Sequence, residues 1–269
     1  MQHLPGKVAV ITGGASGIGR ALAERFVAEH MKVVLADVDE PRLREVEAFL
    51  TEAGGEVATL RCDTSSEADV EALCQFTLER FGAAHVLCNN AGVAGMGDAW
   101  KAPMELWDRV VGVNLYGVLH GIRSFLPVMT EQGEGHIINT ASMAGLIAMP
   151  GGAPYNATKS AVVAISEGLF LELEIIGSPV GVSVLCPGWV RTRLMADEPE
   201  SVDAPVTDFV SQMARAAVDA GIAPEEVADQ VVHAILSGQF WILTHPAMRR
   251  DPVKRMQRAA DQVNPILSL

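Results

Sequence analysis

The residues with the clearest chemical potential are a tyrosine and a lysine four positions apart, Tyr155 and Lys159, in a segment of helical pattern. Side chains at positions i and i+4 share one face of a helix, so the ammonium group is expected close to the phenol. A nearby cation favours the phenolate, and we therefore expect the pKa of Tyr155 to fall from about 10 toward neutral pH. Such a tyrosine can act as a general acid or base. Ser142, at the end of the preceding strand-like segment, gives this short motif its context.

A glycine-rich turn lies near the start of the chain, between a strand-like and a helix-like segment. It reads Gly13-Gly14-Ala15-Ser16-Gly17-Ile18-Gly19. Glycines let the backbone turn sharply and approach a pyrophosphate, and the free N–H groups of a helix N-terminus attract its charge. The spacing is GxxxGxG and not GxGxxG, so the turn matches a variant of the dinucleotide-binding fingerprint.

Asp37 ends the second strand-like segment, about 20 residues beyond that turn, where dinucleotide-binding folds often carry an acidic residue. A carboxylate there can accept hydrogen bonds from the adenosine ribose and would repel a 2′-phosphate. The alternative interpretation is an aspartate that only starts a turn. Ser16 stands where a basic residue would help to hold a phosphate, so NAD is favoured over NADP.

Short apolar segments alternate along the chain with longer segments of helical period, and these elements must position the residues above. The strand-like segments are 7–12, 32–37, 56–62, 85–89, 136–141, 180–186 and 240–244, and the helix-like ones are 18–30, 41–53, 66–81, 103–130, 153–177 and 224–237. Most strands are apolar on both faces, which is typical of parallel strands covered by helices on each side. This predicts one α/β domain over residues 1–269, a Rossmann-like doubly wound parallel sheet of about seven strands with its ligand site at the strands' carboxyl ends.

Two segments break the alternation. Residues 192–219 are rich in Pro, Asp, Glu and Ser before they turn helical, which favours a substrate lid. A C-terminal extension, residues 245–269, carries five basic side chains on an otherwise acidic chain: Arg249, Arg250, Lys254, Arg255 and Arg258. This extension is either a solvated helix face or a contact with an acidic surface of another subunit.

Composition excludes several classes of protein. Acidic residues outnumber basic ones 33 to 20 among the 269 residues, and this net charge of −13 argues against nucleic acid and anionic membrane surfaces as partners. No apolar stretch reaches the roughly 18 residues that span a bilayer, and no signal peptide is recognisable, so we expect a soluble cytoplasmic protein. The four cysteines form no CxxC pair and the seven histidines no HExxH or HxH, which predicts buried thiols and no protein-held metal.

Together these motifs resemble those of the short-chain dehydrogenase/reductase family, in its single-domain NAD(P)-dependent branch. Residues 12–19 (TGGASGIG) are similar to the family's cofactor loop, 89–92 (NNAG) to the segment after its fourth strand, and 187–192 (PGWVRT) to its PGxVxT segment. Four further residues match its catalytic tetrad, namely Asn114, Ser142, Tyr155 and Lys159.

The resemblance implies a role for each tetrad position. Tyr155 would donate a proton to the carbonyl oxygen in reduction, or accept it from the alcohol in oxidation. Lys159 would lower the Tyr155 pKa and bind the nicotinamide ribose, and Ser142 would orient the substrate oxygen. Asn114 would hold a water in a proton relay and bend its helix locally. An asparagine inside an apolar helix is otherwise costly, because its amide needs buried partners.

The resemblance also implies the cofactor contacts. Asp63 would bind the adenine amino group, Asn90 and Gly92 would flank the adenosine ribose, and Val190 and Thr192 would fix the nicotinamide carboxamide. The other implied contacts are Gly13, Ser16, Gly17, Ile18, Gly19, Asp37, Ala91, Pro187 and Gly188.

The leading interpretation is NAD-dependent hydride transfer to or from a secondary alcohol or ketone, which we expect to be hydrophobic. Several soft side chains fall in segments expected around the nicotinamide: Met96, Met143, Met149, Met195 and Trp189. Flexible thioethers suit a bulky apolar ligand, although loop methionines that only fill gaps give the same pattern. Two alternatives stay open. One is an NADPH-dependent 3-oxoacyl thioester reductase, disfavoured by Asp37, and the other is a non-catalytic dinucleotide-binding scaffold, which has no need of all four tetrad residues.

Assembly is the last expectation. The segments 103–130 and 153–177 are apolar over more than one face, and the resemblance implies that they pair with their symmetry mates. We therefore expect a homodimer or homotetramer. The stretch 238–246 departs from the family's usual Gly-Gly ending, which leaves the choice between dimer and tetramer open.

Overall fold

The computed structural model describes residue 1, residues 3–196 and residues 205–266. Its centre is one parallel sheet of seven strands in the order β3-β2-β1-β4-β5-β6-β7. The strands are β1 (Val8–Thr12), β2 (Lys32–Asp37), β3 (Val57–Arg61), β4 (Val86–Asn89), β5 (Gly135–Thr140), β6 (Val180–Cys186) and β7 (Trp241–Leu243). Each bound lies within one residue of the predicted one. The strand order reverses between β1 and β4, which opens a crevice at their carboxyl ends.

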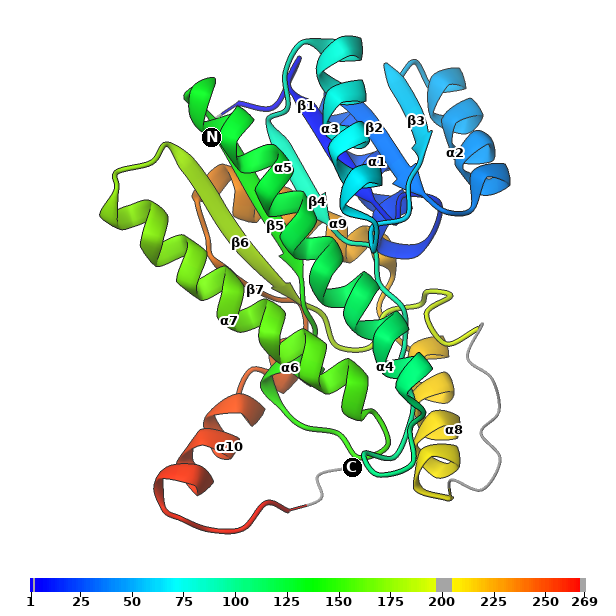
Figure 1. The fold of residues 1–269 in the computed structure, drawn as a ribbon, viewed down its shortest axis with the longest axis vertical. Coiled ribbons are helices and arrows are strands. Elements are labelled where there is room, and N and C mark those ends of the chain that lie inside the picture. The colour runs from blue at the N-terminus through cyan, green and yellow to red at the C-terminus, as the bar shows by residue number, and fades with distance from the viewer. Residues whose placement is uncertain (2, 197–204, 267–269) are drawn as a thin grey trace.

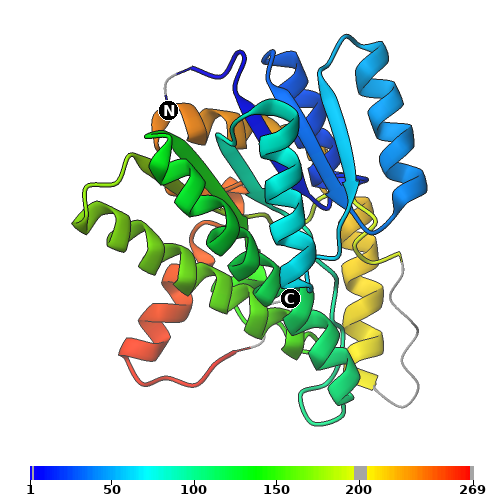
Figure 2. The same cartoon turned by 45° about the horizontal axis from the view of Figure 1, so that its top comes forward.

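Helices cover both faces of the sheet, as predicted (Figures 1 and 2). One layer holds α1 (Gly17–Ala28), α2 (Glu40–Glu52) and α9 (Pro224–Ser237), and the other holds α3 (Glu67–Phe81), α5 (Gly117–Glu131) and α7 (Ala153–Ile175). Alternation along β1 shows why its residues must all be apolar: Ile11 packs toward the first layer and Val10 toward the second, and both are fully buried.

The predicted helix over 103–130 is three elements. These are α4 (Met104–Val111), a π-helical segment (Gly112–Tyr116) and α5. Asn114 lies in the π-helical segment, where its amide binds the backbone of Val93 on both sides: Oδ1 accepts from the N–H at 2.8 Å and Nδ2 donates to the carbonyl at 2.9 Å. The predicted local bend of the helix at Asn114 is therefore confirmed as this π-helical segment. A short helix that the sequence did not indicate, α6 (Met143–Leu146), follows β5.

The helical half of the predicted lid is α8 (Pro205–Asp219), while its residues 197–204 lie outside the described residues. The inner face of α8 is buried through Val210, Ala214 and Val218. Thr207, near its start, donates to the buried carboxylate of Asp98 at 2.6 Å, which ties α8 to the loop after β4.

The C-terminal extension forms a 3₁₀ turn (Pro246–Met248) and α10 (Asp251–Ala260). The helix α10 buries none of its side chains and stands away from the rest of the protein (Figures 1 and 2). One of its basic residues, Arg255, donates to the carbonyl of Leu146 at 2.7 Å.

One apolar face of α5 and of α7 covers the sheet. The buried side chains of this face are Val118, Ile122, Leu169 and Leu173. The exposed apolar side chains on these helices are fewer and include Leu171 and Ile175. The homodimer or homotetramer therefore stays a prediction.

The four cysteines are free and buried, as predicted. Within the described part of the chain, no helix is long and apolar enough to cross a membrane. The same residues contain no group of three His, Cys, Asp or Glu side chains that could hold a metal ion.

Candidate functional site

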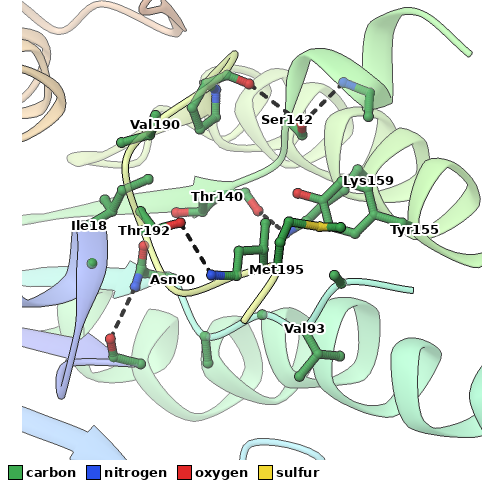
Figure 3. Close-up of a pocket in the computed structure, with 18 of the residues that line it drawn as sticks. Ile18, Asn90, Val93, Thr140, Ser142, Tyr155, Lys159, Val190, Thr192 and Met195 are labelled. Carbon is green, nitrogen blue, oxygen red and sulfur yellow. Dashed lines mark hydrogen bonds between the residues drawn. The ribbon is translucent and has the colours of Figure 1, made fainter. Parts of the chain in front are cut away.

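A cavity of about 470 Å³ opens at the carboxyl ends of the strands and is lined by all the motifs found in the sequence. The glycine-rich turn and the end of β2 form one end, and the tetrad lies toward the other (Figure 3). Of the predicted site residues, those that line the cavity are Gly13, Ser16, Gly17, Ile18, Asp37, Asp63, Asn90, Ala91, Gly92, Ser142, Tyr155, Lys159, Pro187, Gly188, Val190 and Thr192. Gly19 and Asn114 do not line it and lie behind its wall.

The glycine-rich turn packs directly against two other motifs. Gly13 has φ +66°, and a Cβ on it would lie 2.9 Å from the Cα of Ala91. Gly17 has φ +52°, and a Cβ there would lie 3.1 Å from the Cγ2 of Thr192. Both residues combine a left-handed backbone with a close neighbour, and glycine alone meets both demands without strain.

The N-terminus of α1 faces the cavity with its dipole. Ser16 is the N-cap residue, yet its side chain makes no capping hydrogen bond. The first N–H groups of a helix lack intrahelical partners and carry partial positive charge, which attracts an anion. The local chemistry therefore fits a pyrophosphate beside Ser16 and Gly17.

Asp37 serves the fold as well as the cavity. Its Oδ2 accepts from the N–H of Ala15 at 3.1 Å and its Oδ1 accepts from the N–H of Asp39 at 3.1 Å. The carboxylate therefore starts the turn into α2, as the alternative interpretation held, and also faces the cavity. The role in starting the turn is confirmed, and the contact with the adenosine ribose stays a prediction.

Asn90 serves the fold as well as the cavity. Its amide donates to the carbonyl of Thr12 at 3.0 Å, so the side chain holds the glycine-rich turn, and its place beside the adenosine ribose stays a prediction. The Oγ1 of Thr12 in turn accepts from the N–H groups of Asn90 and Ala91, each at 3.0 Å. Thr12 was missed by the sequence analysis, although its place between a buried strand and the turn was the available signal.

Three members of the tetrad meet at the other end (Figure 3). Ser142 caps α6 by accepting from the N–H of Ala144 at 3.1 Å, and its hydroxyl donates to the carbonyl of Pro187 at 3.5 Å. Lys159 is buried, donates from Nζ to the carbonyl of Thr140 at 2.7 Å, and lies 5.6 Å from the centre of the Tyr155 ring.

The expected direction of the Tyr155 pKa shift was wrong. Burial raises the pKa of the phenol, and the hydrogen bond from Ser142 lowers it without reversing the result. Burial also lowers the pKa of Lys159 to about 8. The reason is that both groups are held away from water, which disfavours each charged form, while the ammonium is engaged by Thr140.

Both polar atoms of the Asn114 amide are hydrogen-bonded to the backbone of Val93. It still faces a gap near Lys159. A Cβ on Gly92 would lie 3.4 Å from the Oδ1 of Asn114 and 3.5 Å from the Nζ of Lys159. The glycine therefore leaves open the space between these two polar atoms.

Beyond Tyr155 the lining is apolar and soft. The methionines and the tryptophan predicted around the nicotinamide all line the cavity, namely Met96, Met143, Met149, Met195 and Trp189. Met248, from the C-terminal extension, joins them and was missed, because nothing in the sequence placed that segment beside β6. Asp63 lines the opposite end, with Oδ1 accepting from the N–H and hydroxyl of Ser65.

A family model described as short chain dehydrogenase matches residues 7–203. Among solved structures, a short chain dehydrogenase/reductase from Burkholderia phymatum in complex with NAD is 42% identical, with a TM-score of 0.96 and coverage of 100% of this chain and 99% of that one. A structure of a variant actinorhodin polyketide ketoreductase with NADPH is 34% identical, with a TM-score of 0.77 and coverage of 90% and 97%.

Among curated proteins, the CLA biosynthesis dehydrogenase/reductase of Lactiplantibacillus plantarum is 32% identical over 271 residues and covers 95% of each chain. Other matching relatives are named as dehydrogenases of hydroxy compounds. Likeness of this degree over almost the whole chain shows that the protein is an oxidoreductase and belongs to the short chain dehydrogenase family.

Proposed function

We propose that the protein is an NAD-dependent dehydrogenase that interconverts a hydrophobic secondary alcohol and its ketone. The observation that carries this proposal is one cavity with the α1 N-terminus and Asp37 at one end and Ser142, Tyr155 and Lys159 at the other. The dinucleotide fits the residues present, because the glycine-rich turn admits a close backbone approach and the α1 N-terminus offers unpaired N–H groups. When bound, the nicotinamide supplies or accepts the hydride.

In this proposal, Tyr155 is the proton donor in reduction and the acceptor in oxidation. Ser142 lines the same end of the cavity as Tyr155 and holds the substrate oxygen beside the phenol. Lys159, fixed by Thr140, brings positive charge to this end of the cavity. The space above Gly92 is open for a water between Asn114 and Lys159, through which a proton can pass toward solvent. Positioned acid–base groups of this kind contribute about 10²–10⁴-fold to a rate.

The choice of NAD over NADP rests on charge at the adenosine end. Asp37 places a carboxylate where a 2′-phosphate would bring two further negative charges. Arg42 also lines this end, but it is paired with Asp39 at 3.1 Å, and Ser16 contributes no charge. The NAD complex of the Burkholderia phymatum protein supports this choice, while the NADPH complex of the ketoreductase shows that the fold accepts either nucleotide.

We expect kcat/KM to be at least about tenfold higher with NAD(H) than with NADP(H), a difference of about 1.4 kcal/mol in transition-state stabilisation. Asp37→Ala should narrow this ratio, because it removes repulsion of the 2′-phosphate and leaves Arg42 nearby. Asp261→Ala removes an equal charge from an exposed position beyond α10 and should leave the ratio unchanged. Steady-state rates with a panel of secondary alcohols and both nucleotides test this, and equal rates would contradict the assignment.

A second expectation concerns the turn. A methyl group on Gly19 would lie 2.0 Å from the carbonyl oxygen of Gly13, so Gly19→Ala must move the backbone that faces the pyrophosphate. We expect NADH binding, measured by fluorescence titration, to weaken by more than about tenfold.

The matched control for that variant is Gly168→Ala in α7, where a Cβ meets no atom within 4 Å. This change should leave NADH binding intact and raise the free energy of unfolding by about 0.5–1 kcal/mol, because alanine favours a helix. Unaltered NADH affinity in Gly19→Ala would show that the turn does not hold the nucleotide.

A further inference from the structure

The segment after β6, which begins at Pro187, is hydrogen-bonded to His245 of the C-terminal extension. The N–H of Gly188 donates to the Nδ1 of His245 at 3.1 Å, and the Nε2 of the same ring lies 3.0 Å from the carbonyl oxygen of Trp189. A single imidazole thus binds the backbone at two adjacent residues of the segment that leads to Val190 and Thr192. Both of those residues line the cavity where we place the nicotinamide.

The partners of His245 determine its tautomer. A backbone N–H can only donate, so the Nδ1 that faces Gly188 must be an acceptor. A backbone carbonyl can only accept, so the Nε2 that faces Trp189 must carry the proton. The hydroxyl of Thr244, 2.8 Å from Nδ1, can also donate to it. The neutral ring with its proton on Nε2 satisfies every partner.

Packing reinforces this contact. A Cβ on Gly188 would lie 2.7 Å from the Sδ of Met248 and 2.9 Å from the Cγ of His245, so the segment and the extension fit together only with glycine at this position. The 3₁₀ turn closes when the N–H of Met248 donates to the carbonyl of His245 at 3.0 Å, and it places Met248 in the cavity wall. The same turn therefore supports the segment and shapes the cavity.

The two peptide units depend on His245 to different extents. The Trp189 carbonyl also accepts from the N–H of Ile222 at 3.1 Å, and the N–H of Arg191 donates to the carbonyl of Ile222 at 3.0 Å. Loss of the ring leaves those bonds in place. Within the described residues, the Gly188 N–H has His245 as its hydrogen-bond acceptor, so this N–H is the group that loses its partner.

We infer that His245 is a positioning residue for the nucleotide: its Nδ1 fixes the Gly188 peptide, and through it the backbone that presents Val190 and Thr192 to the nicotinamide. This rests on the proposed function, because it assumes that a nicotinamide nucleotide occupies the cavity. It concerns binding geometry and assigns no proton transfer to His245.

The test uses three variants of the full chain, with NADH and NADPH as probes in fluorescence titrations. His245→Ala removes the acceptor, and the Kd for the preferred nucleotide should rise about tenfold. His245→Asn puts a carbonyl oxygen near the position of Nδ1 and should restore the Kd to within about threefold of wild type. His245→Gln places its amide further out, near Nε2, and should behave like His245→Ala. His233→Ala, an exposed histidine of α9, is the matched control and should bind like wild type.

Thermal unfolding of the same variants separates positioning from folding. A Kd that rises in His245→Ala while the melting temperature stays at that of His233→Ala supports the inference, as does rescue by asparagine but not by glutamine. Wild-type affinity in His245→Ala overturns it, and so does an asparagine variant as weak as the alanine one, since the ring would then act only by packing. If the wild-type protein binds neither nucleotide, the proposed function fails, and this result is distinct from either outcome.

Discussion

Tyr155→Phe is expected to lower kcat by about 10²–10⁴-fold while the Kd for NADH stays within about twofold of wild type. The change removes one oxygen atom, the proposed proton donor, and keeps the ring that packs in the cavity wall. The hydrogen bonds of Ser142 with the Ala144 N–H and the Pro187 carbonyl remain. The effect therefore falls on the chemical step and not on nucleotide binding.

The protein has one other tyrosine, the exposed Tyr116, and Tyr116→Phe is the matched control, with unchanged kcat. Burial raises the pKa of Tyr155, so the phenol form is the acting one for reduction at neutral pH. In the oxidising direction the phenolate is needed, and the rate should rise with pH on the alkaline side. Tyr155→Phe should abolish that rise, and near-normal turnover in this variant would remove Tyr155 from the mechanism.

Lys159→Ala is expected to lower kcat/KM by about 10²-fold or more and also to weaken NADH binding. The first effect follows because the ammonium brings positive charge to the reacting end of the cavity, and the second because a charge-assisted hydrogen bond to the ribose is worth about 1.5–3 kcal/mol. This pattern differs from that of Tyr155→Phe, in which binding survives. Titration of NADH fluorescence beside turnover distinguishes the two variants.

The pH dependence of NADH binding tests the role of the Lys159 ammonium more directly. The pKa of Lys159 is lowered to about 8, so the ammonium is present below that pH and is lost as the pH rises through it. Wild-type affinity for NADH should therefore fall between about pH 7 and 9, and the affinity of Lys159→Ala should stay flat. Lys254→Ala, an exposed change in α10, should follow the wild type. A wild-type affinity constant across this range would contradict a role for the ammonium in binding.

Helices and strands were predictable from the sequence where the spacing of the apolar residues and the residue composition indicate the same element. The two-sided apolar pattern of β1, β2 and β4 specifies parallel strands, and the turn from β1 to α1 specifies an anion-binding helix end. The cavity position followed from topology, because parallel strands bring their carboxyl ends to one edge. For that reason the sequence alone predicts Asp37, Ser142 and Gly188 at one edge of the sheet.

Features that depend on which long-range partner a polar atom finds were not predictable. The amide of Asn90 finds its partner in the carbonyl of Thr12, far away in the sequence, and only the fold brings the two together. The direction of the Tyr155 pKa shift follows from burial of the phenol, which the sequence did not show. Met248 reaches the cavity wall and His245 contacts Gly188 beyond the end of β6, and no local pattern marks such contacts.

The close packing of Gly13 on Ala91 and of Gly17 on Thr192 limits how cofactor preference can be engineered. A turn transplanted from an NADP-using relative would arrive with its own backbone path, and the segments it must fit come from distant parts of the chain. Exchange of the turn alone should yield a poorly fitted hybrid, whereas exchange of all three segments as one block should preserve their contacts. Point changes at Ser16, whose side chain makes no capping hydrogen bond, remove no contact of this packing and are the better starting point for a library, whereas a change at Asp37 also removes the acceptor of the Ala15 N–H.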